Sequence, residues 1–111
     1  MLARIKDRKA LEKATAQHSD YSVLFFWGKF SDAAQRALQE LTEFAREYKE
    51  VPVCLIDVQR MKGVHKDYGV DSVPAVLVMK DGREADRFVG VESAAFYATP
   101  VSYTHLTLPT N

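Results

Sequence analysis

The segment Tyr21–Trp27, with the sequence YSVLFFW, is the feature that most limits what this chain can fold into. It is a continuous apolar run rich in aromatic residues, and it is far too short to span a membrane. Such a run is typical of a β-strand that is covered on both faces, as in a parallel sheet. Pro52–Val58 is a second run of this kind, so the sequence predicts an α/β fold.

A long amphipathic helix is predicted to follow the first strand, beginning at Ser31 or Asp32. Its apolar residues recur at spacings of three and four, which places them in one stripe: Ala34, Ala37, Leu38, Leu41, Phe44, Ala45 and Tyr48. Three shorter helices are expected at Asp7–Gln17, Met61–Tyr68 and Val91–Ala98, and a short first strand at Leu2–Ile5.

The last two strands should form a hairpin. AVLVMK follows Pro74, and Asp81-Gly82 is a strong turn signal before READRFV, which Gly90 ends. The whole order, β-α-β-α-β-α-β-β-α, predicts a central mixed sheet with parallel crossovers, a C-terminal antiparallel hairpin and flanking helices.

Composition narrows the classes of function. The chain has 111 residues, enough for one domain, and its 15 basic and 15 acidic residues cancel. That balance favours neither a nucleic-acid nor a membrane partner. The charged N-terminus lacks the apolar stretch of a signal peptide, so the expected compartment is the cytoplasm. No metal or cofactor is expected, because no His, Cys, Asp or Glu grouping has the spacing of metal ligands.

The C-terminal tail differs in character from the rest. No Asp, Glu, Lys or Arg occurs from Ser93 onward, and Val101–Thr110 resembles a translated transposon-type sequencing adapter. We therefore expect a native domain over residues 1–99, with its last helix truncated, and a non-native tail over residues 100–111.

The order of the elements and the short motifs between them resemble a thioredoxin domain. The matching motifs are Phe26-Trp27, Tyr68-Gly69-Val70, Ser72-Val73-Pro74, Lys80-Asp81-Gly82 and Val89-Gly90. The resemblance covers Leu2–Ala98 and implies the thioredoxin fold.

The family's Trp-Cys-Gly-Pro-Cys motif falls on Phe30, Ser31, Asp32, Ala33 and Ala34. The attacking thiol is replaced by the hydroxyl of Ser31, and the resolving thiol by the methyl group of Ala34. Disulfide exchange requires a thiolate and a second thiol, so no disulfide reductase activity is expected from this chain. The family's buried Asp and accompanying Lys fall on Phe25 and Leu55, which also favours a domain without redox catalysis.

The resemblance also implies that this chain keeps the family's peptide-binding surface. Pro74 falls on the family's cis-proline, and the backbone of the residue before it pairs with extended peptides by strand-like hydrogen bonds. The implied peptide-binding residues are Phe30, Val73, Pro74, Gly90 and Val91. An extended peptide or a partner protein is therefore the expected ligand, although this patch could instead be ordinary core and rim.

Several alternatives accompany this hypothesis. Ser31 could be a nucleophile, but His18 and His65 lie on other segments, and a helix N-cap with Asp32 beside it explains the residue better. Ser31 could also contribute to glutathione recognition. Cys54, the one cysteine, is interpreted as a small buried residue and, less favoured, as a redox sensor.

The favoured function is a non-catalytic module that binds a peptide or a protein, or acts as a scaffold. The alternative is part of a thiol-disulfide oxidoreductase or glutathione-dependent enzyme, whose active thiols lie in a missing downstream domain.

Overall fold

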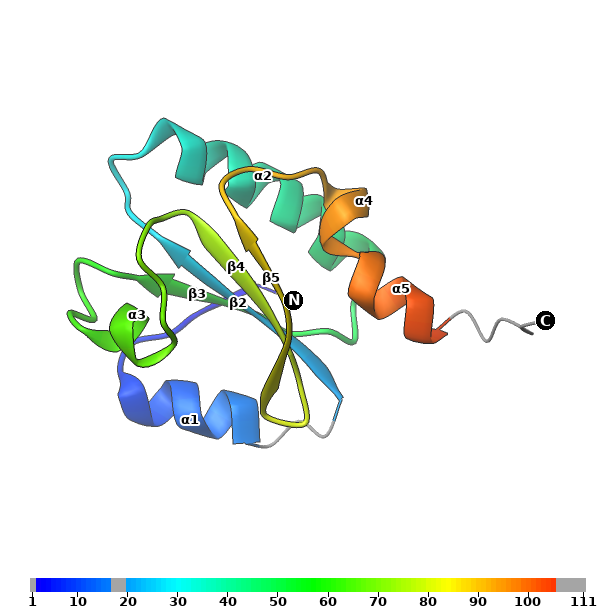
Figure 1. Cartoon of the computed structure of the whole chain (residues 1–111), viewed down its shortest axis with the longest axis horizontal. Helices are drawn as coiled ribbons and strands as arrows, with labels where there is room; N and C mark the ends of the chain where they lie inside the picture. The colour runs from blue at the N-terminus through cyan, green and yellow to red at the C-terminus, as the bar shows by residue number, and fades with distance from the viewer. Residues whose placement is uncertain (1, 17–19, 106–111) are drawn as a thin grey trace.

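The structure, a computed structural model, describes residues 2–16 and 20–105 (Figure 1). The strands are β1 (Leu2–Arg4), β2 (Tyr21–Trp27), β3 (Val53–Asp57), β4 (Ala75–Lys80) and β5 (Arg83–Val89). The helices are α1 (Arg8–Ala16), α2 (Asp32–Glu47), α3 (Val64–Asp67), α4 (Ala94–Tyr97) and α5 (Thr99–His105).

One five-stranded mixed sheet organises the described residues, in the order β1-β3-β2-β4-β5. Strand β3 pairs in parallel with β1 and β2, whereas β4 pairs antiparallel with β2 and β5. The predicted α/β fold with a C-terminal hairpin is therefore confirmed. This topology brings the carboxyl ends of β1, β2 and β3 to the same end of the sheet as the start of β4, and we call this the upper end of the sheet.

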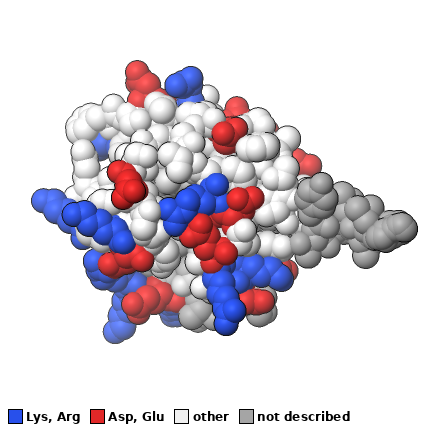
Figure 2. All heavy atoms as spheres, viewed as in Figure 1, with Lys and Arg blue, Asp and Glu red and all other residues white. Residues whose placement is uncertain are grey.

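Helices cover both faces of the sheet. One apolar cluster joins the sheet to α2, α4 and α5, and a second joins the opposite face to α1 and α3. All seven residues of Tyr21–Trp27 are buried, which confirms the prediction of a strand covered on both faces. On the face shown in Figure 2, acidic and basic side chains are interleaved mainly over the lower half.

Two helices are shorter than the sequence pattern predicted. Helix α3 does not include Met61, because Gly63, at φ 86°, bends the chain immediately before Val64. Helix α4 does not begin at Val91: Ser93 caps it by accepting a hydrogen bond from the amide of Phe96 at 3.1 Å.

The division at residue 99 stays a prediction. Helix α5 crosses that boundary, and Val101 is fully buried in the cluster beside α2 and α4. The remainder of the expected tail, residues 106–111, lies outside the described residues, as do residues 17–19 with His18. None of the helices in the described ranges has the length and apolar character to cross a bilayer.

Candidate functional site

The turn before α2 is held by the backbone and by Ser31. The amide of Ser31 donates to the carbonyl of Gly28 at 3.1 Å, which closes the turn after β2. The Ser31 hydroxyl accepts a hydrogen bond from the amide of Ala34 at 3.1 Å, and Asp32 occupies the first turn of the helix. The N-cap interpretation of Ser31 is therefore confirmed.

Phe30 projects from this turn into solvent. Its relative exposure is 80%, the largest for a large hydrophobic residue within residues 2–16 and 20–105, and the ammonium of Lys29 lies 5.1 Å from its ring centroid. An exposed aromatic ring on a backbone-braced turn costs little entropy to bury against a ligand, so Phe30 is suited to anchor one.

The loop before β4 lies beside this turn. The Val73–Pro74 peptide bond is cis. The Val73 side chain reaches the turn. Its Cγ2 atom lies so close to Gly28 that a side chain at that position would contact it, at 3.8 Å from the Cβ. Among the described residues, none forms a hydrogen bond with the backbone amide or carbonyl of Val73. These two groups are thus available for pairing with another chain.

The remaining predicted peptide-binding residues contribute less surface. Pro74 is buried, and its carbonyl accepts a hydrogen bond from the amide of Gly90 at 2.9 Å. Val91 is half-buried against the core. Val89, which was not among the predicted peptide-binding residues, is 59% exposed and lies next to Gly90. The exposed apolar surface near this loop therefore comes mainly from Phe30 and Val89, whereas Val73 and Val91 are both half-buried.

Arg87 braces the same loop from β5. Its guanidinium donates to the carbonyl of Tyr68 at 2.6 Å and to that of Gly69 at 2.8 Å, and Glu84 completes its hydrogen bonds. Hydrogen bonding to Arg87 lowers the pKa of Glu84. Sequence spacing could not reveal this contact, because Arg87 lies 18 residues from Gly69 and 19 from Tyr68 along the chain.

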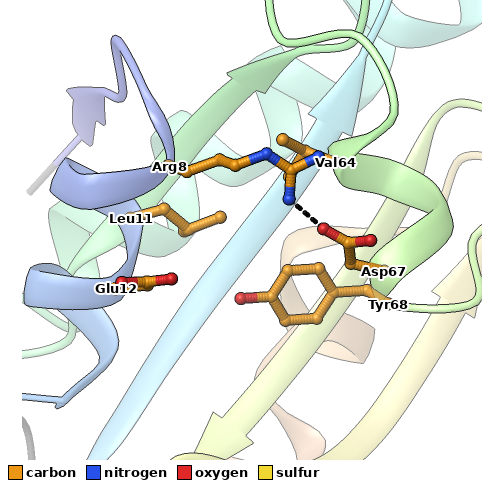
Figure 3. Close-up of a pocket in the computed structure, with 6 residues that line it drawn as sticks. All are labelled: Arg8, Leu11, Glu12, Val64, Asp67 and Tyr68. Atoms are coloured by element: carbon orange, nitrogen blue, oxygen red, sulfur yellow. Dashed lines mark hydrogen bonds and ion pairs between the residues drawn. The ribbon is translucent and has the colours of Figure 1, made fainter.

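A hollow of about 250 Å³ lies between α1 and α3 (Figure 3). An ion pair between Arg8 and Asp67 closes one side of it, and the Tyr68 ring points toward Glu12 and Leu11. Burial raises the pKa of Tyr68, and the neighbouring carboxylates raise it further. The described part of the chain contains no group of three or more potential metal ligands.

His65 does not supply a base for Ser31. It lies on α3, which packs on the opposite face of the sheet from α2. Its Nδ1 atom is buried without a hydrogen-bond partner among the described residues. His18, the other histidine considered, lies outside the described residues.

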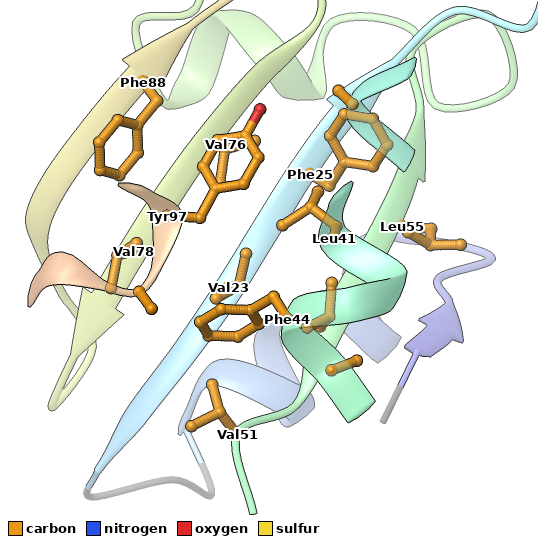
Figure 4. Close-up of a cluster of buried hydrophobic side chains, with 14 of the residues drawn as sticks. Val23, Phe25, Leu41, Phe44, Val51, Leu55, Val76, Val78, Phe88 and Tyr97 are labelled. Atoms are coloured by element: carbon orange, nitrogen blue, oxygen red, sulfur yellow. The ribbon is translucent and has the colours of Figure 1, made fainter. Parts of the chain in front are cut away.

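Two core positions beneath the turn hold apolar residues where the family pattern has an Asp and a Lys. Phe25 and Leu55 are direct neighbours across β2 and β3, and both face α2 (Figure 4). Phe25 is fully buried, and its ring stacks on that of Trp27 at 6.4 Å. Nothing at this position can accept or donate a proton.

Cys54 is also unsuited to thiol chemistry. It is 1% exposed at the centre of the sheet, and burial raises the pKa of its thiol to about 11. A thiol with such a pKa is protonated near neutral pH and inaccessible to a substrate. The interpretation of Cys54 as a small buried residue is confirmed.

Comparison with known proteins bears on this fold and site. A family model described as Thioredoxin matches residues 3–99. Over 70 residues the chain is 33% identical to Thioredoxin H8 of Arabidopsis thaliana, a match that covers 63% of this chain and 47% of that protein. The chain thus spans about half the length of that relative.

Other matches extend over more of the chain. Thioredoxin-2 of Saccharomyces cerevisiae is 24% identical over 95 residues, which are 86% of this chain and 91% of that protein. The X-ray structure of Fasciola hepatica thioredoxin superposes with a TM-score of 0.80 at 23% identity, covering 89% of this chain and 96% of that one. At this identity the structural match shows a shared fold.

Proposed function

The chain belongs to the thioredoxin family, and from that premise we propose that it is a non-catalytic module that binds an extended peptide or a segment of a partner protein. The binding surface is the Val73 surface, which we define as Phe30, the backbone of Val73, and the neighbouring residues Val89 to Val91.

The observation that carries this proposal is the unpaired backbone of Val73. Its amide and carbonyl have no hydrogen-bond partner among the described residues, and the exposed Phe30 ring projects from the adjoining turn. An extended peptide can satisfy both backbone groups in the manner of an added strand, while an apolar side chain of the peptide covers Phe30. Backbone pairing of this kind gives affinity with little dependence on sequence.

The side chains at the turn support the proposal that this module does not catalyse thiol-disulfide exchange. The Ser31 hydroxyl serves as a helix cap, Ala34 is buried, and Cys54 lies in the middle of the sheet. Thiol-disulfide exchange needs an accessible thiolate and a second thiol to release the mixed disulfide. Neither group is present at this turn.

Binding can be tested with a short, unfolded, cysteine-free peptide rich in apolar residues, followed by chemical-shift mapping of the labelled protein. We expect shifts at Phe30, Val73 and Val89. Replacing Phe30 by Ala should weaken binding about tenfold, as truncation of an aromatic anchor commonly does. Phe96→Ala is the matched control, because Phe96 is 48% exposed on α4. Unmoved resonances at the Val73 surface would refute the proposal.

Catalysis can be tested by reduction of insulin disulfides. The chain should give no turnover above background, whereas the double variant Ser31→Cys/Ala34→Cys provides the assay control by restoring two thiols at the helix N-terminus, where a thiol pKa is lowered. Turnover by the unaltered chain would contradict a non-catalytic role.

Membership of the thioredoxin family also supports a second candidate at a coarse level. In it, the chain is part of a thiol-disulfide oxidoreductase or glutathione-dependent enzyme, with active thiols on another segment. The full gene distinguishes the two candidates, since a further Cys-x-x-Cys pair would favour the enzyme.

A further inference from the structure

A group of basic side chains lines two adjoining hollows at the upper end of the sheet, where β1 and β3 end. The first hollow, of about 130 Å³, includes Arg4 and Asp57, and the second, of about 230 Å³, includes Arg8 and Lys62. Lys6 and Arg60 line both. We call this surface the basic edge, and its members are Arg4, Lys6, Arg8, Arg60 and Lys62.

The positive charges of the basic edge are incompletely neutralised. The side chains of Lys6, Arg60 and Lys62 form no ion pair or hydrogen bond with any residue in the described ranges. The two acidic residues that line the hollows are engaged with backbone amides: Asp7 accepts from Ala10 at 2.8 Å and Asp57 from Gln59 at 2.9 Å.

This excess is local, because the chain as a whole has 15 basic and 15 acidic residues. Basic side chains project from the left side of the molecule in Figure 2, beside the start of α1 and the loop before α3 in Figure 1. A surface with an excess of positive charge on a neutral protein attracts and orients a ligand of negative charge.

Buried apolar side chains form part of the lining of both hollows. Trp27 and Leu55 contribute to the first hollow, and Met61 and Val64 to the second. The Arg4 guanidinium carbon lies 5.9 Å from the Trp27 ring centroid, so this cation extends over an aromatic face. The surface thus offers both ion pairing and apolar contact along two successive depressions.

We propose that the basic edge binds an acidic peptide segment of a partner protein, in which apolar side chains alternate with carboxylates. Two hollows that share Lys6 and Arg60 suit a ligand longer than one anion. The exposed lysines and arginines are not fixed around a single point, as they would be around a phosphate group. This site shares no residue with the Val73 surface, because its members come from β1, the start of α1 and the loop after β3.

The test uses a short fluorescein-labelled peptide in which glutamate pairs alternate with single leucines, with binding followed by fluorescence anisotropy. The charge reversal Lys6→Glu/Arg60→Glu should weaken binding by about tenfold or more, and added sodium chloride should weaken binding to the unaltered chain. A peptide with glutamine in place of glutamate should not bind measurably.

The matched control is Lys49→Glu/Arg83→Glu, which changes the net charge equally at exposed positions. Lys49 precedes the amino end of β3 and Arg83 follows the β-hairpin turn, so both lie at the opposite end of the sheet from the basic edge. This control should bind the peptide as the unaltered chain does. Thermal melts of both double variants confirm that each is folded.

Three results would overturn the proposal. The first is equal loss of binding in the control, which would indicate a general charge effect. The second is equal binding of the glutamine peptide, which would exclude recognition of carboxylates. The third is displacement by inorganic phosphate well beyond that by chloride at the same ionic strength, which would assign the surface to a phosphate ligand.

Discussion

Individual side chains decide which chemistry this chain can perform. Cys54 carries the one thiol of the sequence, yet its place at the centre of β3 leaves it 1% exposed. Burial disfavours the thiolate and raises the thiol pKa from 9.0 to about 11. The same burial that makes Cys54 inert couples its ionisation to the stability of the fold.

This coupling predicts a loss of stability in alkaline solution. Well below pH 9.0 the thiol is protonated in both states, and between pH 9.0 and about 11 mainly the unfolded chain releases its proton. Stability should therefore fall as pH rises through that window, with a limiting slope of about 1.4 kcal/mol per pH unit. Urea unfolding of the chain and of Cys54→Ala, both under reducing conditions, measures the effect.

The variant separates the contribution of the thiol from that of Tyr68 and Tyr97, whose raised pKa values are common to both proteins. Cys54→Ala is expected to be less stable at neutral pH because it leaves a small cavity, and its deficit should shrink as pH rises. If the free energies of unfolding of the two proteins instead changed in parallel with pH, burial would not raise the pKa of the Cys54 thiol, and the prediction would be wrong.

Contacts between elements hold the loops that form the candidate site. Arg87 on β5 donates to the carbonyls of Tyr68 and Gly69, at the end of α3, a few residues before the cis bond at Pro74. Gly90, just after β5, donates to the carbonyl of Pro74. Strand β5 therefore braces both ends of the segment that carries Val73.

Replacing Arg87 by Ala should loosen this segment. Two carbonyl groups lose a charged donor, so we expect the free energy of unfolding to fall. The decrease should be only about 1 to 2 kcal/mol, because Arg87 is partly exposed and solvent weakens its hydrogen bonds. Hydrogen exchange should accelerate over residues 68–74, as measured by mass spectrometry.

Arg83→Ala is the control on the same strand, because Arg83 is exposed and has no side-chain partner among the described residues. Unchanged exchange in Arg87→Ala would mean that Gly90 and the core hold the loop without the guanidinium.

At the scale of the whole molecule, the C-terminal helices complete the core over α2. Tyr97 and Val101 are almost fully buried in the cluster that contains Phe44 and Leu41. The Tyr97 hydroxyl accepts a hydrogen bond from the amide of Glu92 at 3.0 Å, which fixes the approach to α4. Residues on both sides of position 99 therefore contribute to one folded unit.

Val101→Ala should destabilise the fold by about 2 kcal/mol, from lost apolar burial and the cavity that remains. Chemical denaturation measures the change, and Ser102→Ala at the neighbouring half-buried position should have little effect. A Val101→Ala variant as stable as the unaltered chain would show that α5 does not dock on the core in solution.

The sequence alone accounted for the strands, the long helix and the Ser31 cap. These follow from local rules: continuous apolar runs for Tyr21–Trp27 and Val53–Asp57, a stripe at helical spacing for α2, and a hydroxyl at its start. The family resemblance then placed Phe25 beside Leu55, and their pairing across β2 and β3 agrees with it.

Only the tertiary structure decided the rest, because it depends on groups distant in sequence. The amide of Ala94 at the start of α4 donates to the carboxylate of Glu40 on α2, Arg87 meets Tyr68 across the sheet edge, and Pro74 is buried while Val89 is exposed. Likewise, a chain of zero net charge gave no sign of the basic edge. Periodicity reports which face of an element is buried, but only the packed fold brings β1 and the loop after β3 together and so concentrates their charges.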